Sequence, residues 1–265
     1  MLAPVAFGTL HYDLIGPDNA LIVCMLHSLT SDCGMWSDQV PDLLAAGFQI
    51  LRLDMRGHGG SHAPDGDYRI EDLAADVLAV LDRLAIDSVH LVGLSIGGMI
   101  GQVLAADHPR RIKSLTACAT TSRWTGDTAM MRRRLDLVRA TGTLEGIVDD
   151  AMQQRYSPIV MERRPARWRA LRDSFLGTSL HGYLGCMHAV LNHDVSQRLR
   201  RVSAPTLVIS GSDDPVTPPE AGREIASLVE NASYVEIARG RHLLNVEFAN
   251  EVNPLLLDWL SSLTA

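Results

Sequence analysis

The sequence lacks most of the features that mark membrane, secreted or repetitive proteins. It contains no internal repeat and no low-complexity linker. It begins MLAPVAFGTLHYDLIG, without a basic segment ahead of an apolar one, so we expect no secretory signal. Its most membrane-like stretch, residues 88–106, is interrupted by glycines, Ser95 and Gln102. These residues predict a strand, a turn and a helix, and we expect no membrane span.

Excess positive charge and closely spaced cysteines are also missing. The chain has 24 Lys and Arg against 31 Asp and Glu, and its net charge of -7 argues against nucleic acid or an anionic membrane as the main partner. It has only four cysteines in 265 residues, and a core of this size needs no disulfide framework. We therefore predict reduced thiols and a cytoplasmic location. The four cysteines are Cys24, Cys33, Cys118 and Cys186.

The sequence does contain enough apolar residues, 46%, for a packed core. Strand-like apolar runs alternate with helix-like segments, such as residues 70–85, whose leucines and valines recur at helical spacing. This alternation predicts an α/β fold with a mostly parallel central sheet flanked by helices. The predicted strands are residues 21–27, 48–54, 88–94, 112–118, 204–210 and 232–238.

The alternation is interrupted once, between Thr121 and Val202, where the sequence becomes helical and arginine-rich. Helices are predicted there over residues 128–142, 144–156 and 164–178. We therefore expect a core of residues 1–121 and 203–265, with an inserted helical cap of residues 122–202.

One short motif places a hydroxyl at a sharp reversal of the chain. Residues 93–97, Gly-Leu-Ser-Ile-Gly, follow an apolar strand and open a helix. This is the context of a nucleophile elbow, in which residues without Cβ relieve crowding around the serine. The alternative is a glycine-rich turn that binds an anion or only packs. The motif alone does not decide between the two, so Ser95 needs partners.

A serine nucleophile requires a base, and the base requires a carboxylate that orients it. Asp214 lies in a loop after the predicted strand 204–210, and His242 lies in a loop after the strand 232–238. In parallel sheets such loops open at one edge, so we expect Ser95, Asp214 and His242 to converge. Asp214 is preferred to Asp213 because it precedes Pro215 at the tip of the loop.

A tetrahedral intermediate also needs two N–H donors. We predict Ile96, directly after the nucleophile, and Leu29, in the loop after strand 21–27. His27 and Ser28 in that loop are expected to shape it and to contact the substrate.

The cap offers further candidates for binding substrate. Trp124 is a candidate apolar wall, and one of Arg132, Arg133 and Arg134, of which we choose Arg133, is a candidate partner of a substrate carboxylate. Against these roles, apolar residues at helical spacing usually pack a core, and a run of arginines is usually solvated.

With these segments in place, the chain resembles the α/β-hydrolase family along nearly its whole length. DMRGHGGS, residues 54–61, is similar to a turn common in that family. Residues 27–36, 56–77, 155–165, 172–190 and 204–224 are similar to 3-oxoadipate enol-lactonases. The resemblance implies serine-catalysed opening of a lactone or cleavage of a small carboxylic ester. Thr30 departs from it, because those lactonases usually have glycine there.

Two other functions stay open. A serine, histidine and aspartate in this arrangement also serve carbon–carbon bond hydrolases of ring-cleavage products. Some proteins of this fold keep the three residues but act as ligand receptors. We predict no metal, because the histidines and cysteines lack a tight ligand spacing, and no cofactor. The expected partner is a small ester or lactone, with no nucleic acid and no membrane, and a homo-oligomer is left open.

Overall fold

An eight-stranded sheet forms the centre of the molecule in the computed structural model, which describes residues 1–263. The strand order is β1-β2-β4-β3-β5-β6-β7-β8. The strands are β1 (Leu2–Val5), β2 (Gly8–Ile15), β3 (Ile22–Leu26), β4 (Gln49–Leu53), β5 (Val89–Leu94), β6 (Ile112–Cys118), β7 (Thr206–Gly211) and β8 (Ala232–Ile237).

The sheet is mostly parallel, and the predicted fold class is confirmed. β1 pairs with β2, and β2 with β4, in antiparallel register, whereas every pair from β4 to β8 is parallel. The parallel strands are connected through helices, and their central members are buried on both faces. Their carboxyl ends therefore lie at one edge of the sheet.

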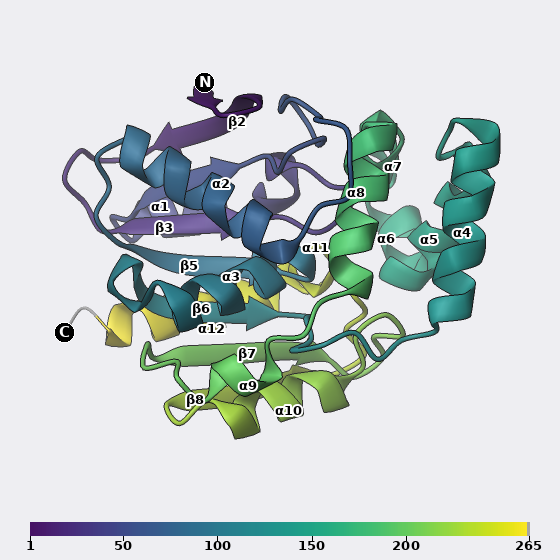
Figure 1. Cartoon of the computed structure of the whole chain (residues 1–265). Helices are drawn as coiled ribbons and strands as arrows, with labels where there is room; N and C mark the ends of the chain where they lie inside the picture. Colours follow the sequence, from purple (N-terminus) through teal and green to yellow (C-terminus); the bar gives the residue numbers. More distant parts are fainter. Residues whose placement is uncertain (264–265) are drawn as a thin grey trace.

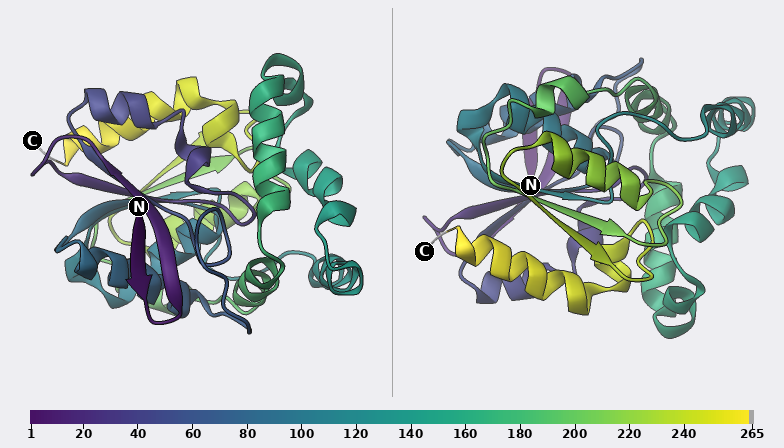
Figure 2. Two further views of the ribbon diagram at one scale, coloured as in Figure 1. Left: turned by 90° about the horizontal axis from the view of Figure 1, so that it is seen from above. Right: turned by 90° about the horizontal axis from the view of Figure 1, so that it is seen from below.

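Helices cover both faces of this sheet (Figure 1; Figure 2). One face packs against α1 (Val40–Ala45) and α12 (Ala249–Ser262), and the other against α2 (Ile70–Arg83), α3 (Ile96–Asp107) and α10 (Pro219–Leu228). Short helical segments complete the connections: η1 (Cys33–Trp36), η2 (Pro109–Arg111), α9 (Ser196–Leu199) and α11 (Leu244–Glu247). In α2 the predicted apolar face, Leu73, Val77, Val80 and Leu81, is buried.

Among residues 1–263, six helices lie between β6 and β7 in the chain, and all but α9 lie on the side toward which the parallel strands point (Figure 1). The helices on that side are α4 (Thr128–Thr141), α5 (Glu145–Arg155), α6 (Pro158–Arg163), α7 (Pro165–Gly177) and α8 (Leu180–Leu191). We propose that residues 122–202 form a cap over the carboxyl edge of the sheet, and we use this name for them below.

The structure adds elements that the sequence did not separate. The alternating N-terminal segment is a hairpin of two strands, β1 and β2. In the cap, α4, α5 and α7 match the predicted helices, whereas α6 and α8 were not predicted as helices of their own.

The structure of residues 1–263 bears on disulfides and on membrane-spanning helices. All four cysteines lie in this part of the chain and are free. Within the same residues, no helix combines the length and the apolar character needed to cross a membrane.

Candidate active site

Ser95 lies at the sharp turn between β5 and α3. Its backbone adopts φ 57° and ψ -119°, and its N–H donates to the carbonyl of Cys118 at 2.9 Å. The flanking glycines allow this turn. A Cβ on Gly93 would lie 2.3 Å from the carbonyl oxygen of Gly97, and a Cβ on Gly97 would lie 2.3 Å from that of Leu26. A strained serine held in this way is typical of a functional position.

His242 lies between Ser95 and Asp214. His242 Nε2 is 2.9 Å from Ser95 Oγ, and His242 Nδ1 is 2.9 Å from Asp214 Oδ2. The imidazole and the carboxylate are buried, with 1% and 3% of their residue surfaces exposed. Both distances are those of hydrogen bonds, so the structure brings these three predicted residues together.

The loop after β7 holds the Asp214 carboxylate through both of its oxygens. Asp214 Oδ1 accepts from the N–H groups of Val216 at 2.8 Å and Thr217 at 3.1 Å, and the Thr217 hydroxyl donates to Oδ2 at 2.7 Å. Asp213 is exposed and accepts from the hydroxyl of Ser212. The structure thus places Asp214, and not Asp213, at His242.

The loop after β3 presents the N–H of Leu29. The carbonyl of Ser28 lies 2.8 Å from His27 Nδ1 and accepts from the N–H of Ser31 at 3.1 Å. A trans peptide points its N–H away from its C=O, so these two bonds fix the direction of the Leu29 N–H. Leu29 also lines the cavity that contains Ser95.

Two buried histidines support this loop in their neutral form. His27 Nε2 accepts from the N–H of Met55 at 2.9 Å, and His58 Nε2 accepts from that of Thr30 at 3.0 Å. A nitrogen that accepts carries no proton, which agrees with the direction of the pKa shifts. Burial lowers the pKa of His27 and lowers that of His58 to about 3.

A narrow cavity between Ser95 and the cap has only about 50 Å³ open to the centres of water molecules. Its lining is mostly apolar, and Trp124 belongs to it. Two arginines of the cap, Arg134 and Arg155, also line it. Arg134 is paired with Asp150 on α5.

Arg155 is a half-buried cation that lines this cavity. Burial lowers its pKa to about 10, so the guanidinium stays charged at neutral pH. Its carbon Cζ lies 5.2 Å from the centre of the Phe175 ring, and Nη1 donates to Thr30 Oγ1. Among residues 1–263 no carboxylate lies within ion-pair distance of Arg155. A half-buried guanidinium without a counter-ion has no ion pair, and an anionic ligand in the cavity would supply one.

The sequence pattern of the α/β hydrolase fold matches residues 22–154 and 167–249. The chain belongs to the α/β hydrolase family. This hydrolase is 33% identical over 238 residues to "3-oxoadipate enol-lactonase 2" of Acinetobacter baylyi, covering 90% of this chain and 88% of that one.

Solved structures show the same similarity. The enol-lactonase from Burkholderia xenovorans LB400 has a TM-score of 0.94 at 35% identity, with 98% of this chain and all of that chain covered. A hydrolase from Pseudomonas aeruginosa PA01 has a TM-score of 0.93 at 32% identity, covering 98% and 97%.

Three of the residues predicted to bind substrate need correction. His27 and Ser28 are fully buried and do not line the cavity. The imidazole of His27 bonds instead to the carbonyl of Ser28 and the N–H of Met55. Arg133 is exposed on α4 and points away from the cavity, and the neighbouring Arg134 lines it instead.

Sequence reasoning missed two residues of this site. Thr217 was not predicted, although a hydroxyl three residues after a carboxylate is well placed to bond to it. Arg155 was one arginine among many, at the end of a predicted helix. Its only signal was its place in a stretch similar to the lactonases.

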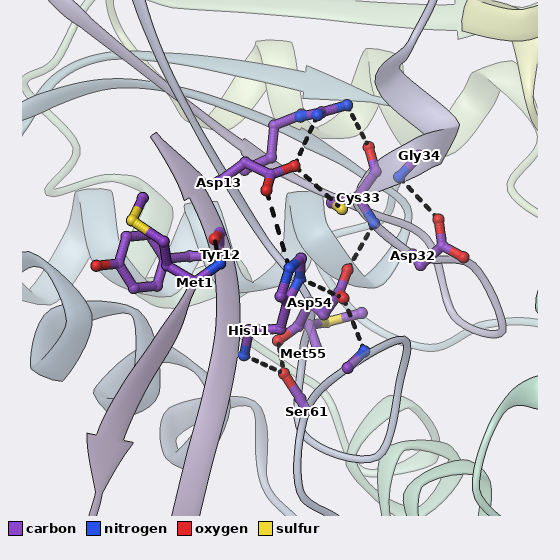
Figure 3. Close-up of polar contacts among 12 residues, drawn as sticks. Met1, His11, Tyr12, Asp13, Asp32, Cys33, Gly34, Asp54, Met55 and Ser61 are labelled. Atoms are coloured by element: carbon purple, nitrogen blue, oxygen red, sulfur yellow. Dashed lines mark hydrogen bonds and ion pairs between the residues drawn. The ribbon is translucent and has the colours of Figure 1, made fainter. Parts of the chain in front are cut away.

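One other cluster could attract a metal ion. His11, Cys33 and Asp54 bring three potential ligand atoms within 4.8 Å of one another. Figure 3 shows that these groups already bind protein partners: Asp54 accepts from His11 Nδ1 at 2.9 Å and from the N–H of Cys33 at 2.7 Å, and Asp13 is paired with Arg52. This network joins β2, β4 and η1, and we assign it a structural role.

Proposed function

We propose that this hydrolase opens a small lactone, or cleaves a small carboxylic ester, through an acyl-enzyme on Ser95. The observation that carries the proposal is the pair of 2.9 Å contacts of His242, one to Ser95 Oγ and one to Asp214 Oδ2. A base held between a hydroxyl and a buried carboxylate is the arrangement that turns serine into a nucleophile.

In the first half-reaction, Ser95 Oγ attacks the substrate carbonyl carbon while His242 Nε2 takes the hydroxyl proton. The carbonyl oxygen becomes an oxyanion, for which the N–H groups of Leu29 and Ile96 are the proposed donors. His242 then returns the proton to the leaving oxygen as the C–O bond breaks. In a lactone that alcohol stays attached to the acyl group.

In the second half-reaction, a water molecule attacks the acyl-enzyme, and His242 takes its proton. The second tetrahedral intermediate uses the same two donors. Its collapse returns the proton to Ser95 and releases the carboxylic acid. Asp214 keeps His242 Nδ1 protonated and the ring oriented throughout.

Two features support a small, acidic substrate. The narrow cavity limits the size of the acyl group. Arg155, charged and without a carboxylate partner among residues 1–263, offers a guanidinium fork to a substrate carboxylate. The similarity to the enol-lactonases of Acinetobacter baylyi and Burkholderia xenovorans supports a lactone over an open-chain ester.

The decisive experiment compares the natural protein with the Ser95→Ala variant on p-nitrophenyl acetate. We expect the variant to lose on the order of 10³-fold or more in kcat while its circular dichroism stays unchanged. A fluorophosphonate should label Ser95 in the natural protein. Turnover retained by Ser95→Ala would refute the mechanism.

The same assay tests the substrate class. We expect a higher kcat/KM for a p-nitrophenyl ester with a terminal carboxylate than for the neutral ester of the same length. Product analysis on a lactone and on a vinylogous diketone separates ester chemistry from carbon–carbon hydrolysis. Tight ligand binding with negligible turnover of every substrate would indicate a receptor.

A further inference from the structure

Thr30 adopts a backbone conformation that threonine rarely tolerates. Its φ is 57°, in the left-handed region, and it is a β-branched residue with 1% of its surface exposed. A strained residue of this kind persists only when its surroundings hold it in place, and such residues gather at functional sites. Thr30 directly follows Leu29, one of the two proposed oxyanion donors.

Three hydrogen bonds hold Thr30. Its N–H donates to His58 Nε2 at 3.0 Å, and its hydroxyl donates to the carbonyl of Leu29 at 2.6 Å. The hydroxyl oxygen accepts the third bond, from Arg155 Nη1. Because that bond occupies a lone pair of Oγ1, the hydroxyl hydrogen is directed toward Leu29.

Arg155 reaches the loop from the cap. It is the last residue of α5, and its own carbonyl accepts from the N–H of Leu243, next to His242, at 3.1 Å. One residue of the cap thus contacts both the loop of Leu29 and the loop of His242. Its hydrogen bond to Thr30 is charge-assisted. Among residues 1–263 no carboxylate pairs with Arg155 and competes for the guanidinium.

We propose that Arg155 is a positioning residue, which acts through the Thr30 hydroxyl to hold the Leu29–Thr30 peptide in its active orientation. Rotation of this peptide changes ψ of Leu29 and φ of Thr30 together, so it would carry Thr30 out of the left-handed region, relieve its strain and displace the Leu29 carbonyl. The Leu29 N–H belongs to the preceding peptide, which the two bonds to the Ser28 carbonyl hold, so the bridge from Arg155 fixes Leu29 from its carboxyl side. The bridge from Arg155 opposes that rotation. The inference rests on the proposed function, because it concerns the oxyanion donor of the same reaction.

The test uses p-nitrophenyl acetate, which has no carboxylate, so that loss of substrate binding to Arg155 does not contribute. We expect Thr30→Val and Arg155→Met to lower kcat about tenfold with KM changed less than about twofold, since a misplaced donor weakens only the transition state. Combining the two substitutions should add no further loss, because both remove one bridge.

Three further variants separate positioning from stability. Thr30→Ser keeps the hydroxyl and should keep kcat. Thr30→Gly relieves the strain, so it should unfold at the same or a higher temperature than the natural protein and still lose kcat. Arg169→Met, at an exposed arginine of α7 that does not line the cavity, is the matched control and should match the natural protein.

The outcomes are distinct. If the natural protein does not hydrolyse the ester, the proposed function fails. If it does, and Thr30→Val and Arg155→Met keep its kcat, the positioning role is wrong while the proposed function stands. The role is also overturned if kcat follows the melting temperature across the variants and Thr30→Gly is fully active.

Discussion

Thr217 shows how a single hydroxyl orients the buried base. It donates to Asp214 Oδ2 at 2.7 Å, the same oxygen that faces His242. We expect Thr217→Val, which keeps the shape but removes the donor, to lower kcat about tenfold with little change in KM, because a hydrogen bond to a charged group contributes about 1.5–3 kcal/mol.

Thr217→Ser supplies the control for this prediction, because it restores the hydroxyl and should restore most of kcat. Steady-state kinetics on p-nitrophenyl acetate measure both variants. A valine variant with the kcat of the natural protein would show that the backbone N–H groups of Val216 and Thr217 suffice to hold Asp214.

At the same scale, the arginines of α4 show why residue types alone did not define the cavity. Buried Met131, Leu135 and Val138 mark the inner face of this helix. At 100° per residue, Arg134 lies about 70° from the centre of that face, whereas Arg133 lies nearly opposite it. The positions of these residues around the helix therefore predict that Arg134, and not Arg133, faces the cavity. Arg155 could not be chosen in this way, because its role depends on a contact with Thr30, 125 positions away in the chain.

At the scale of elements, the sequence predicts a strand or helix where a single local pattern of apolar residues marks it. All six predicted strands are present, each within two residues of its predicted ends, because buried parallel strands are short apolar runs between turns. Helix α8 was missed because Gly182 and Gly185 interrupt it, and glycine disfavours helices in isolation. Its glycines are explained by packing: a Cβ on Gly182 would lie 2.5 Å from Gly57 Cα.

The packing of the elbow against β3 gives a prediction at this scale. A Cβ on Gly97 would overlap the backbone carbonyls of Leu26 and His27, which cannot move without shifting the loop of Leu29. We expect Gly97→Ala to destabilise the fold by about 1–3 kcal/mol and to reduce kcat. Urea unfolding and ester kinetics measure the two effects.

Gly177 provides the matched control for that substitution. It ends α7, and a Cβ added there would meet no atom within 4 Å. Gly177→Ala should therefore leave activity unchanged and stability equal or slightly higher. Equal behaviour of the two alanine variants would show that the elbow has more room than its backbone contacts indicate.

At the scale of the whole molecule, the neutral buried histidines make stability depend on pH. Burial lowers the pKa of His27 and His90, lowers that of His193 to about 4 and lowers that of His58 to about 3. In the unfolded chain a histidine takes up a proton near pH 6.5. The unfolded state therefore binds more protons below that pH, and the folded state loses stability as the pH falls.

We expect the free energy of unfolding, measured by urea denaturation, to be constant above about pH 7. It should decrease steadily from pH 6.5 toward pH 4, by on the order of 1 kcal/mol per pH unit for each histidine that stays neutral when folded. His58→Gln, whose amide oxygen can accept from the Thr30 N–H, should be less stable at pH 7 but lose less on acidification. The exposed His108→Gln variant is the control and should keep the natural slope. An unchanged slope in His58→Gln would mean that His58 becomes protonated without unfolding, contrary to its role as the acceptor of the Thr30 N–H.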